Sequence, residues 1–384
     1  MRISPVVLML AVLACSEAPS GGGEPPARDE TNSLVLEVEV GHQSGTEFAY
    51  VGDAAVAEDG SLYVLDPRSR HVLWFDSSGN FAGALGGPGD GPGEFQAPVA
   101  IAIDGNHLMV WDTGAWRVTT FDTRGALVGT EPVPPRRESG WPVVVRYSQE
   151  GEWLYLDQEI ETPDQAGVEV QNGIIRGVAH LLSWRSGSQW IERAQFPGME
   201  AALVEYDGEL ALSNAPFPAG PLWAAGPDGS IWYADSRSYS ISKRSGGKDT
   251  TDVITARSRG PEVTDSAWLA FVGGSAGNSA TPEARQRSKL PRPDVQPVLA
   301  QMVSNPAGEL WVQLRNNGRS VENEWHVYSP DGVPRFRVRL PREFRIHKVV
   351  NDWIVGDIRD SMGVQTVRRY RINGAAGEGT TADD

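Results

Sequence analysis

The stretch Asp59-Gly-Ser-Leu-Tyr-Val-Leu-Asp66 decides the fold, because near copies of it recur along the chain. In each copy a turn ending in glycine is followed by a strand of alternating apolar residues, and an aspartate often closes the strand. The other copies occupy residues 104–112, 150–157, 228–235, 307–314 and 351–357. A repeated unit of this kind predicts an all-β architecture built from similar small sheets.

The spacing of the units predicts how many sheets there are. From residue 66 the closing positions follow at intervals of 46, 45, 78, 78 and 44 residues. Three of these intervals match the period of about 40–45 residues of a β-propeller blade. A short apolar segment precedes each unit and a second hairpin follows it, as in residues 51–57 and 71–85. Four antiparallel strands that are apolar on both faces must stack on neighbours, so we predict a six-bladed β-propeller.

The two intervals of 78 residues hold sequence beyond one blade period. Residues 160–177 and 198–220 resemble loops, and we predict insertions there. The alternative is a seventh blade around residues 203–213.

A third irregular segment, residues 257–295, is predicted to be a partly helical insertion. Pro261 and Pro282 are placed as first-turn prolines, and Thr281 as a helix cap.

The two ends of the repeated region complement each other. The last unit ends near residue 373 with only three strands, whereas residues 33–40 form an alternating strand without a partner. We predict that this first strand completes the last blade, which removes a sheet edge and closes the ring. The propeller therefore spans residues 33–373, and the small polar residues 374–384 are predicted to be a disordered tail.

The N-terminus predicts export. Residues 1–15 combine a short basic start with an apolar run that is too short for a stable membrane span. Val12-Leu13-Ala14-Cys15 resembles the lipobox of bacterial lipoproteins, and Cys15 is the only cysteine in the chain. An ordinary signal peptide is the alternative. Residues 16–32 have the composition of a flexible tether, and the serine after Cys15 favours an outer-membrane anchor facing the periplasm or the cell surface.

Charge and composition exclude several classes of function. The net charge of −16 makes nucleic acid and anionic lipid surfaces poor partners, so membrane contact is expected only through the lipid. The one Gly-x-Ser-x-Gly pattern in the chain, residues 273–277, lies inside the predicted helical insertion and does not follow a strand as a nucleophile elbow does, and the one thiol lies at the lipidation site. The sequence therefore offers no familiar nucleophile, and no clear catalytic residue.

The repeats resemble those of bacterial NHL-repeat and related six-bladed β-propeller lipoproteins, within the TolB-like propeller superfamily. The resemblance is carried by the unit that ends at Asp66, the Phe-Asp-x-x-Gly turns at residues 75–79 and 121–125, and the glycine-rich connector at residues 86–98. It implies a fold shared by binding modules, lyases and lactonases. Some of these enzymes use His, Asp and Glu near the channel mouth, so bound calcium or zinc is an open possibility although no metal motif is evident.

Candidate ligand-binding residues fall into two groups. In the insertion, Trp268, Arg285 and Arg287 belong to a basic and aromatic patch, which is unusual in an acidic chain. This patch is interpreted either as a lid that attracts an anionic or carbohydrate ligand, or as a solvated helix on the propeller edge. The second group consists of Arg146, Arg345 and His347, which lie on predicted inner strands and are expected to line the channel.

The repeated aspartates have two interpretations as well. They could form a ring of carboxylates for a cation, or they could accept hydrogen bonds from the main chain of the next turn, which we favour. Together these features favour a membrane-anchored propeller that binds a small-molecule, carbohydrate or protein ligand. A metal-dependent lyase or lactonase is the first alternative, and an envelope scaffold protein is the second.

Overall fold

The computed structural model describes residues 32–41, 46–135, 144–148, 150–159, 173–206, 209–273, 281–316 and 320–373. The expected signal peptide, Cys15, most of the tether and the tail lie outside these residues.

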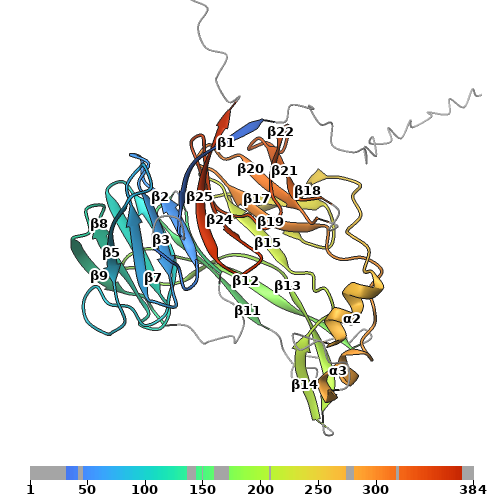
Figure 1. Ribbon diagram of the computed structural model, residues 1–384. Coiled ribbons are helices and arrows are strands. Elements are labelled where there is room, and N and C mark those ends of the chain that lie inside the picture. Colours follow the sequence, from blue (N-terminus) through green and yellow to red (C-terminus); the bar gives the residue numbers. More distant parts are fainter. Residues whose placement is uncertain are drawn as a thin grey trace, which may run out of the picture.

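The described chain forms six antiparallel sheets around a common axis, as Figure 1 shows. Blade 1 consists of β2 (Asp53–Val56), β3 (Leu62–Asp66), β4 (His71–Phe75) and β5 (Phe81–Gly86). Blade 2 consists of β6 (Pro98–Asp104), β7 (His107–Asp112), β8 (Arg117–Asp122) and β9 (Leu127–Pro132). Blade 3 consists of β10 (Val144–Tyr147), β11 (Trp153–Glu159), β12 (Ile174–Trp184), β13 (Ile191–Tyr206) and β14 (Glu209–Asn214).

The remaining sheets complete the ring. Blade 4 consists of β15 (Pro221–Ala225), β16 (Ile231–Asp235), β17 (Ser240–Ser245) and β18 (Lys248–Thr255). Blade 5 consists of β19 (Leu299–Ser304), β20 (Leu310–Leu314), β21 (Glu322–Tyr328) and β22 (Pro334–Pro341). Blade 6 consists of β23 (Arg345–Val350), β24 (Trp353–Arg359), β25 (Gln365–Asn373) and β1 (Ser33–Val40). The prediction of six blades is confirmed.

The first strand closes the ring, as predicted. β1 pairs antiparallel with β25, from Ser33 opposite Asn373 to Val40 opposite Val367. An ion pair of 2.5 Å between Arg368 and Glu39 links the two strands further. Because the first and last strands share one sheet, the last blade has its full set of four strands.

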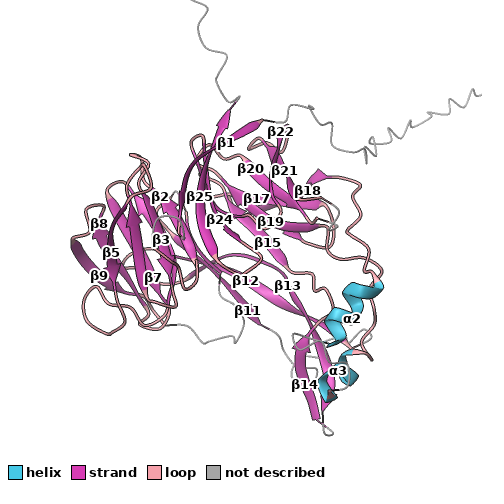
Figure 2. Ribbon diagram, in the orientation of Figure 1, coloured by secondary structure: helices cyan, strands magenta, loops and turns pink. Residues whose placement is uncertain are grey.

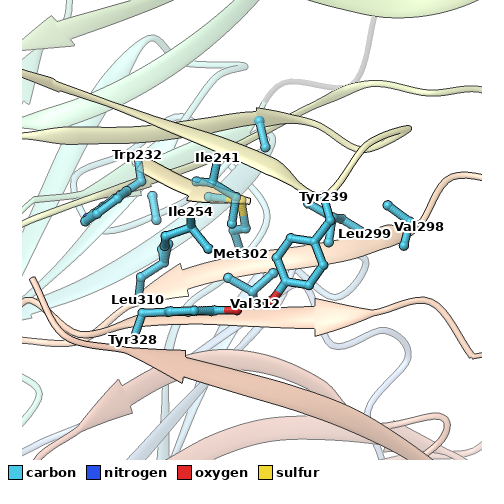
Figure 3. Close-up of a cluster of buried hydrophobic side chains, with 12 residues drawn as sticks. Trp232, Tyr239, Ile241, Ile254, Val298, Leu299, Met302, Leu310, Val312 and Tyr328 are labelled. Atoms are coloured by element: carbon cyan, nitrogen blue, oxygen red, sulfur yellow. Dashed lines mark hydrogen bonds between the residues drawn. The ribbon is translucent and has the colours of Figure 1, made fainter. Parts of the chain in front are cut away.

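The hydrophobic core lies between neighbouring blades. Between blades 4 and 5, Trp232 and Ile241 from one sheet meet Met302, Leu310 and Tyr328 from the other (Figure 3). Each fully buried side chain of this size stabilises the fold by about 1.5–3 kcal/mol. Since every interface needs two repeats, a single blade could not bury its own apolar faces.

Blade 3 departs from the sequence-based expectation. The residues 198–220 that were expected to be a loop instead supply the end of β13 and all of β14. The strands continue because the register shifts between Arg176 and Val178, where a Cβ on Gly198 would lie 2.8 Å from the carbonyl carbon of Gly177. Only glycine allows this close approach, so a residue that resembles a turn signal lies inside a strand.

Blade 3 also tests the prediction of a seventh blade and the prediction of a loop at residues 160–177. Residues 203–213 extend blade 3 rather than form a seventh blade among the described residues. Of the other expected loop, residues 160–172 lie outside the described part, and β12 begins at Ile174.

The insertion after blade 4 is partly helical, as predicted, and Figure 2 shows its two helices at one end of a molecule made mostly of strands. They are α2 (Asp265–Gly273) and α3 (Pro282–Arg287). Thr281 caps α3 by accepting a hydrogen bond of 3.1 Å from the main-chain N–H of Ala284, and Pro282 occupies the first turn. Within the described residues, neither helix has the length and apolar character to cross a membrane.

The expected role of Pro261 is wrong, because α2 begins only at Asp265. The residue after Pro261, Glu262, instead makes a short antiparallel bridge with Val295. The prolines therefore act differently: one starts a helix, and the other lies in an extended segment that holds the base of the insertion.

Candidate functional site

The six inner strands, β2, β6, β10, β15, β19 and β23, surround a cavity of about 320 Å³ on the propeller axis. Every one of them contributes to its lining, through Asp53, Val99, Arg146, Trp223, Gln301 and His347 among others. A further hollow of about 280 Å³ shares Tyr147 and Lys348 with this cavity. The two hollows are therefore neighbours, and we call the cavity of about 320 Å³ the axial channel.

Arg146 reaches from blade 3 to the inner strands of blades 4 and 5. Its Nη1 donates hydrogen bonds to the main-chain carbonyl of Trp223 at 2.8 Å and to that of Met302 at 3.1 Å. The guanidinium also lies 4.7 Å from the centre of the Trp223 ring, a cation–π contact. Among the described residues, no carboxylate lies within ion-pair distance of it.

Burial lowers the pKa of Arg146 to about 10, and the negative charge of Asp53 acts in the opposite direction. The guanidinium therefore stays charged at neutral pH. A half-buried charge held by neutral carbonyls and an aromatic face is a natural position for an anionic ligand.

On the other side of the axis, β23 supplies a cluster of charged side chains. Arg345 donates from Nε to Asp357 Oδ1 at 2.8 Å and from Nη2 to the carbonyl of Val51 at 2.8 Å. His347 lies between two carboxylates, with Nε2 at 2.8 Å from Asp357 Oδ1 and Nδ1 at 3.3 Å from Asp53 Oδ1. These contacts join blade 6 to blade 1 at the channel wall.

Both carboxylates of the cluster are ionised at neutral pH. Burial by itself raises the pKa of Asp53, but the charge of Lys348 and the hydrogen bond from His347 outweigh it and bring the pKa to about 2. For Asp357, burial is likewise outweighed by His347 and Arg345, and its pKa is lowered. Around the cavity of about 320 Å³, the three cations Arg146, Arg345 and Lys348 thus meet two carboxylates, while the neighbouring hollow adds the carboxylate of Asp104.

The cluster does not fit a calcium or zinc ion. His347, Asp53 and Asp357 do converge, yet no group of three His, Cys, Asp or Glu side chains in the described part of the chain could hold a metal. The two ring nitrogens of His347 already face different carboxylates, and Arg345 and Lys348 bring positive charge to the same two carboxylates. A metal ion would have to displace these cations.

The structure separates the two groups of predicted ligand-binding residues. Arg146, Arg345 and His347 line the axial channel, whereas Trp268, Arg285 and Arg287 contribute nothing to its lining. Trp268 instead packs on Phe271, with ring centres 5.5 Å apart. The insertion lies against blade 3, where Leu290 packs on residues of β13, so it is not a lid over the channel.

Sequence reasoning missed part of the channel. Asp53, Trp223 and Gln301 lie on inner strands that the sequence does predict, but no signal separates them from ordinary strand residues. Lys348 follows His347 directly and could have been found from its neighbour. The repeated aspartates at Asp66 and Asp112, in contrast, accept hydrogen bonds from main-chain N–H groups of the blade connections.

Comparisons with known proteins agree on the fold. The family DUF5128, described as a 6-bladed beta-propeller, matches residues 46–172. No curated protein matches the chain. Fold and family match therefore define a six-bladed β-propeller.

Similar solved structures are distant. A member of the DUF4221 family from Bacteroides vulgatus is 10% identical, with a TM-score of 0.49 over 90% of this chain and 99% of that chain. Virginiamycin B lyase from Staphylococcus aureus is 10% identical, with a TM-score of 0.42 over 88% of this chain and 100% of that chain. A gluconolactonase from Xanthomonas campestris is 12% identical, with a TM-score of 0.40 over 92% of this chain and 99% of that chain. Likenesses this distant carry no inference about activity.

Proposed function

We propose that the protein is a binding propeller whose axial channel accepts a small carboxylate-bearing molecule, such as a sugar acid. The observation that carries this proposal is Arg146, a half-buried guanidinium whose only polar contacts among the described residues are main-chain carbonyls. A cavity of about 320 Å³ suits a small molecule rather than a folded partner.

The neighbours of Arg146 favour binding over catalysis. The Trp223 ring fixes the guanidinium from one side, so little side-chain entropy is lost when a ligand binds. The excess of cations around the cavity attracts anions, and Gln301, whose Nε2 donates a hydrogen bond to the main-chain carbonyl of Ile346, belongs to the same lining. The carboxylates Asp53 and Asp357 hold the cations of blade 6 in place rather than face the ligand alone.

Calorimetric titration tests this proposal with D-glucuronate as the charged probe and D-glucose as its uncharged counterpart. We expect saturable binding of glucuronate, weaker binding of glucose, and at least about a tenfold loss of glucuronate affinity in Arg146→Gln. Arg285→Gln, a change at an exposed arginine away from the channel, is the control. Equal affinities for the two sugars, or an unchanged affinity in Arg146→Gln with a native circular dichroism spectrum, would exclude the proposal.

The first alternative, a metal-dependent lyase or lactonase, is tested by elemental analysis of the purified protein with a thermal scan after chelation. Because the channel residues do not fit a metal, we expect no stoichiometric calcium or zinc and no shift in melting temperature. One metal ion per chain whose removal lowers the melting temperature would favour the alternative instead. No feature of the described residues favours the envelope scaffold.

We further propose that the propeller is exported and anchored in the outer membrane through a lipid on Cys15, facing the periplasm or the cell surface. The support is the sequence alone: an apolar leader, a lipobox and a single cysteine at the expected position. Cys15→Ser is expected to move the protein from the membrane fraction to the soluble fraction, and mass spectrometry of the wild type should find a lipid on this residue. Retention of Cys15→Ser in the membrane fraction would contradict the anchor.

A further inference from the structure

A larger cavity, of about 790 Å³, lies beside the insertion and shares no lining residue with the axial channel. Its wall comes from the segment after β14, from α2 and α3, and from the end of β20. Figure 1 shows α2 and α3 next to β14, at the opposite end of the molecule from β1. We call this cavity the insertion cavity. The four side chains that matter for its chemistry are Phe217, Phe271, Arg287 and Arg315.

Two arginines of the insertion cavity lack the partners that comparable arginines have. Arg292, in the same insertion, pairs with Asp265 at 2.7 Å, and Arg237 of blade 4 pairs with Glu200 at 2.5 Å. In the described part of the chain, Arg287 and Arg315 form no ion pair. Partial desolvation also lowers the pKa of Arg315. Arg287 is half-buried and Arg315 is exposed, and two cations without a counter-charge on one cavity wall favour an anionic occupant.

Aromatic rings form another part of the same wall. The Phe217 and Phe271 rings lie 6.1 Å apart, and Trp268 continues the group behind Phe271 at 5.5 Å. Phe217 has a φ of 50°, in the left-handed region that a bulky side chain seldom adopts. Strain of this kind persists where the surroundings hold the residue, and it occurs often at binding sites. Here it accompanies a ring at the cavity wall.

We propose that the insertion cavity is a second binding site, for a small organic anion that combines a flat apolar ring with a carboxylate. The ring would pack on Phe217 and Phe271, and the carboxylate would bind Arg287 and Arg315. The volume is within the range of small-molecule sites. An uncharged sugar would use the aromatic wall but would leave the two guanidinium groups without a counter-charge.

Calorimetric titration of the purified full chain with 2-naphthoate tests this site, with 2-naphthamide as the uncharged probe of the same shape. Saturable binding of naphthoate and at least about a tenfold weaker binding of naphthamide are expected. Arg287→Gln and Arg315→Gln should each weaken naphthoate binding by about tenfold or more. Phe217→Ala should weaken both probes.

The matched control is Arg285→Gln, because Arg285 lies on the same helix and does not line the cavity. It should bind naphthoate as the wild type does. The site is refuted if naphthoate does not bind, if the two probes bind equally, or if folded Arg287→Gln and Arg315→Gln bind with wild-type affinity. If binding is lost in Arg146→Gln and in none of the other variants, naphthoate binds in the axial channel. That outcome would also refute the site in the insertion cavity.

Discussion

Blade 2 and blade 6 carry an aspartate at the same place, the end of the second strand, and use it in different ways. In blade 2, Asp112 is fully buried, and its hydrogen-bond donors in the described part of the chain are main-chain N–H groups, those of Gln96, Ala97, Gly114 and Ala115. In blade 6, Asp357 accepts from side chains, those of Arg345, His347 and Gln365. One carboxylate holds the connection between blades, whereas the other holds charges at the channel.

The difference teaches that position in a repeat predicts a role only when the neighbours repeat too. β6 begins with Pro98 and Val99, whose side chains have no hydrogen-bond donor. Asp112 therefore accepts hydrogen bonds from the main chain of the connecting segments. β23 begins with Arg345 and carries His347, which compete for Asp357. The same residue type therefore has a structural role in one blade and supports the candidate site in another.

The largest effect is expected for Asp112→Ala. Four main-chain N–H groups would lose their acceptor in a buried place, and we expect the free energy of unfolding to fall by about 3 kcal/mol. Chemical denaturation measures this. Asp122→Ala is the comparison, since Asp122 accepts from Arg124 and Ala126 in an exposed turn and its loss should have a much smaller effect. Equal losses in the two variants would mean that the buried connection has no special role.

An intermediate effect, which depends on pH, is expected for Asp53→Asn. The folded pKa of Asp53 is about 2, below its ordinary value of 3.8, so its ionised form stabilises the fold above the ordinary value and this stabilisation is lost as the pH falls towards 2. We expect the stability difference between wild type and variant to be largest above about pH 5 and to shrink by about 2 kcal/mol on acidification.

Denaturation curves at several pH values, or a titration of the Asp53 carboxyl carbon by NMR, measure this linkage. A carboxyl that titrates near its ordinary value would show that Lys348 and His347 do not act on Asp53 as the contacts indicate.

The smallest change in stability is expected for Asp357→Asn, about 1 kcal/mol, because the amide keeps the shape, its oxygen still accepts a hydrogen bond, and its partner Arg345 is partly exposed to water. Removing one negative charge beside the axial channel should at the same time raise its affinity for glucuronate. Calorimetry and denaturation on the same variant measure both. A drop in affinity with intact folding would show that Asp357 is needed to position Arg345 for ligand binding.

Most of the fold could be predicted from the sequence because its signals are local. The alternation in Leu62–Asp66, the glycine-ended turns and the blade period each depend on neighbouring residues, and the orphan strand Ser33–Val40 was matched to a blade that lacked one. The failures were local conflicts. Gly198 resembles a turn but permits a close approach of two strands, and Pro261 resembles a helix start but lies in an extended segment.

The candidate sites could be predicted only in part. Arg146, Arg345 and His347 were found because the inner strands were found, and inner strands of a propeller face the axis. Their partners Asp53 and Trp223 come from other blades, and nothing near them in the sequence indicates the contact. The basic and aromatic patch of the insertion was recognised, but its place beside blade 3 was not.

The sequence by itself determined six sheets, their closure by the first strand and the presence of a helical insertion, because periodic burial and turn formation are properties of short segments. Only the tertiary structure decided that Arg146 meets carbonyls of blades 4 and 5, that His347 lies between carboxylates of blades 1 and 6, and that the insertion borders its own cavity. These contacts join residues far apart in the chain, and their geometry follows from how the blades pack around the axis.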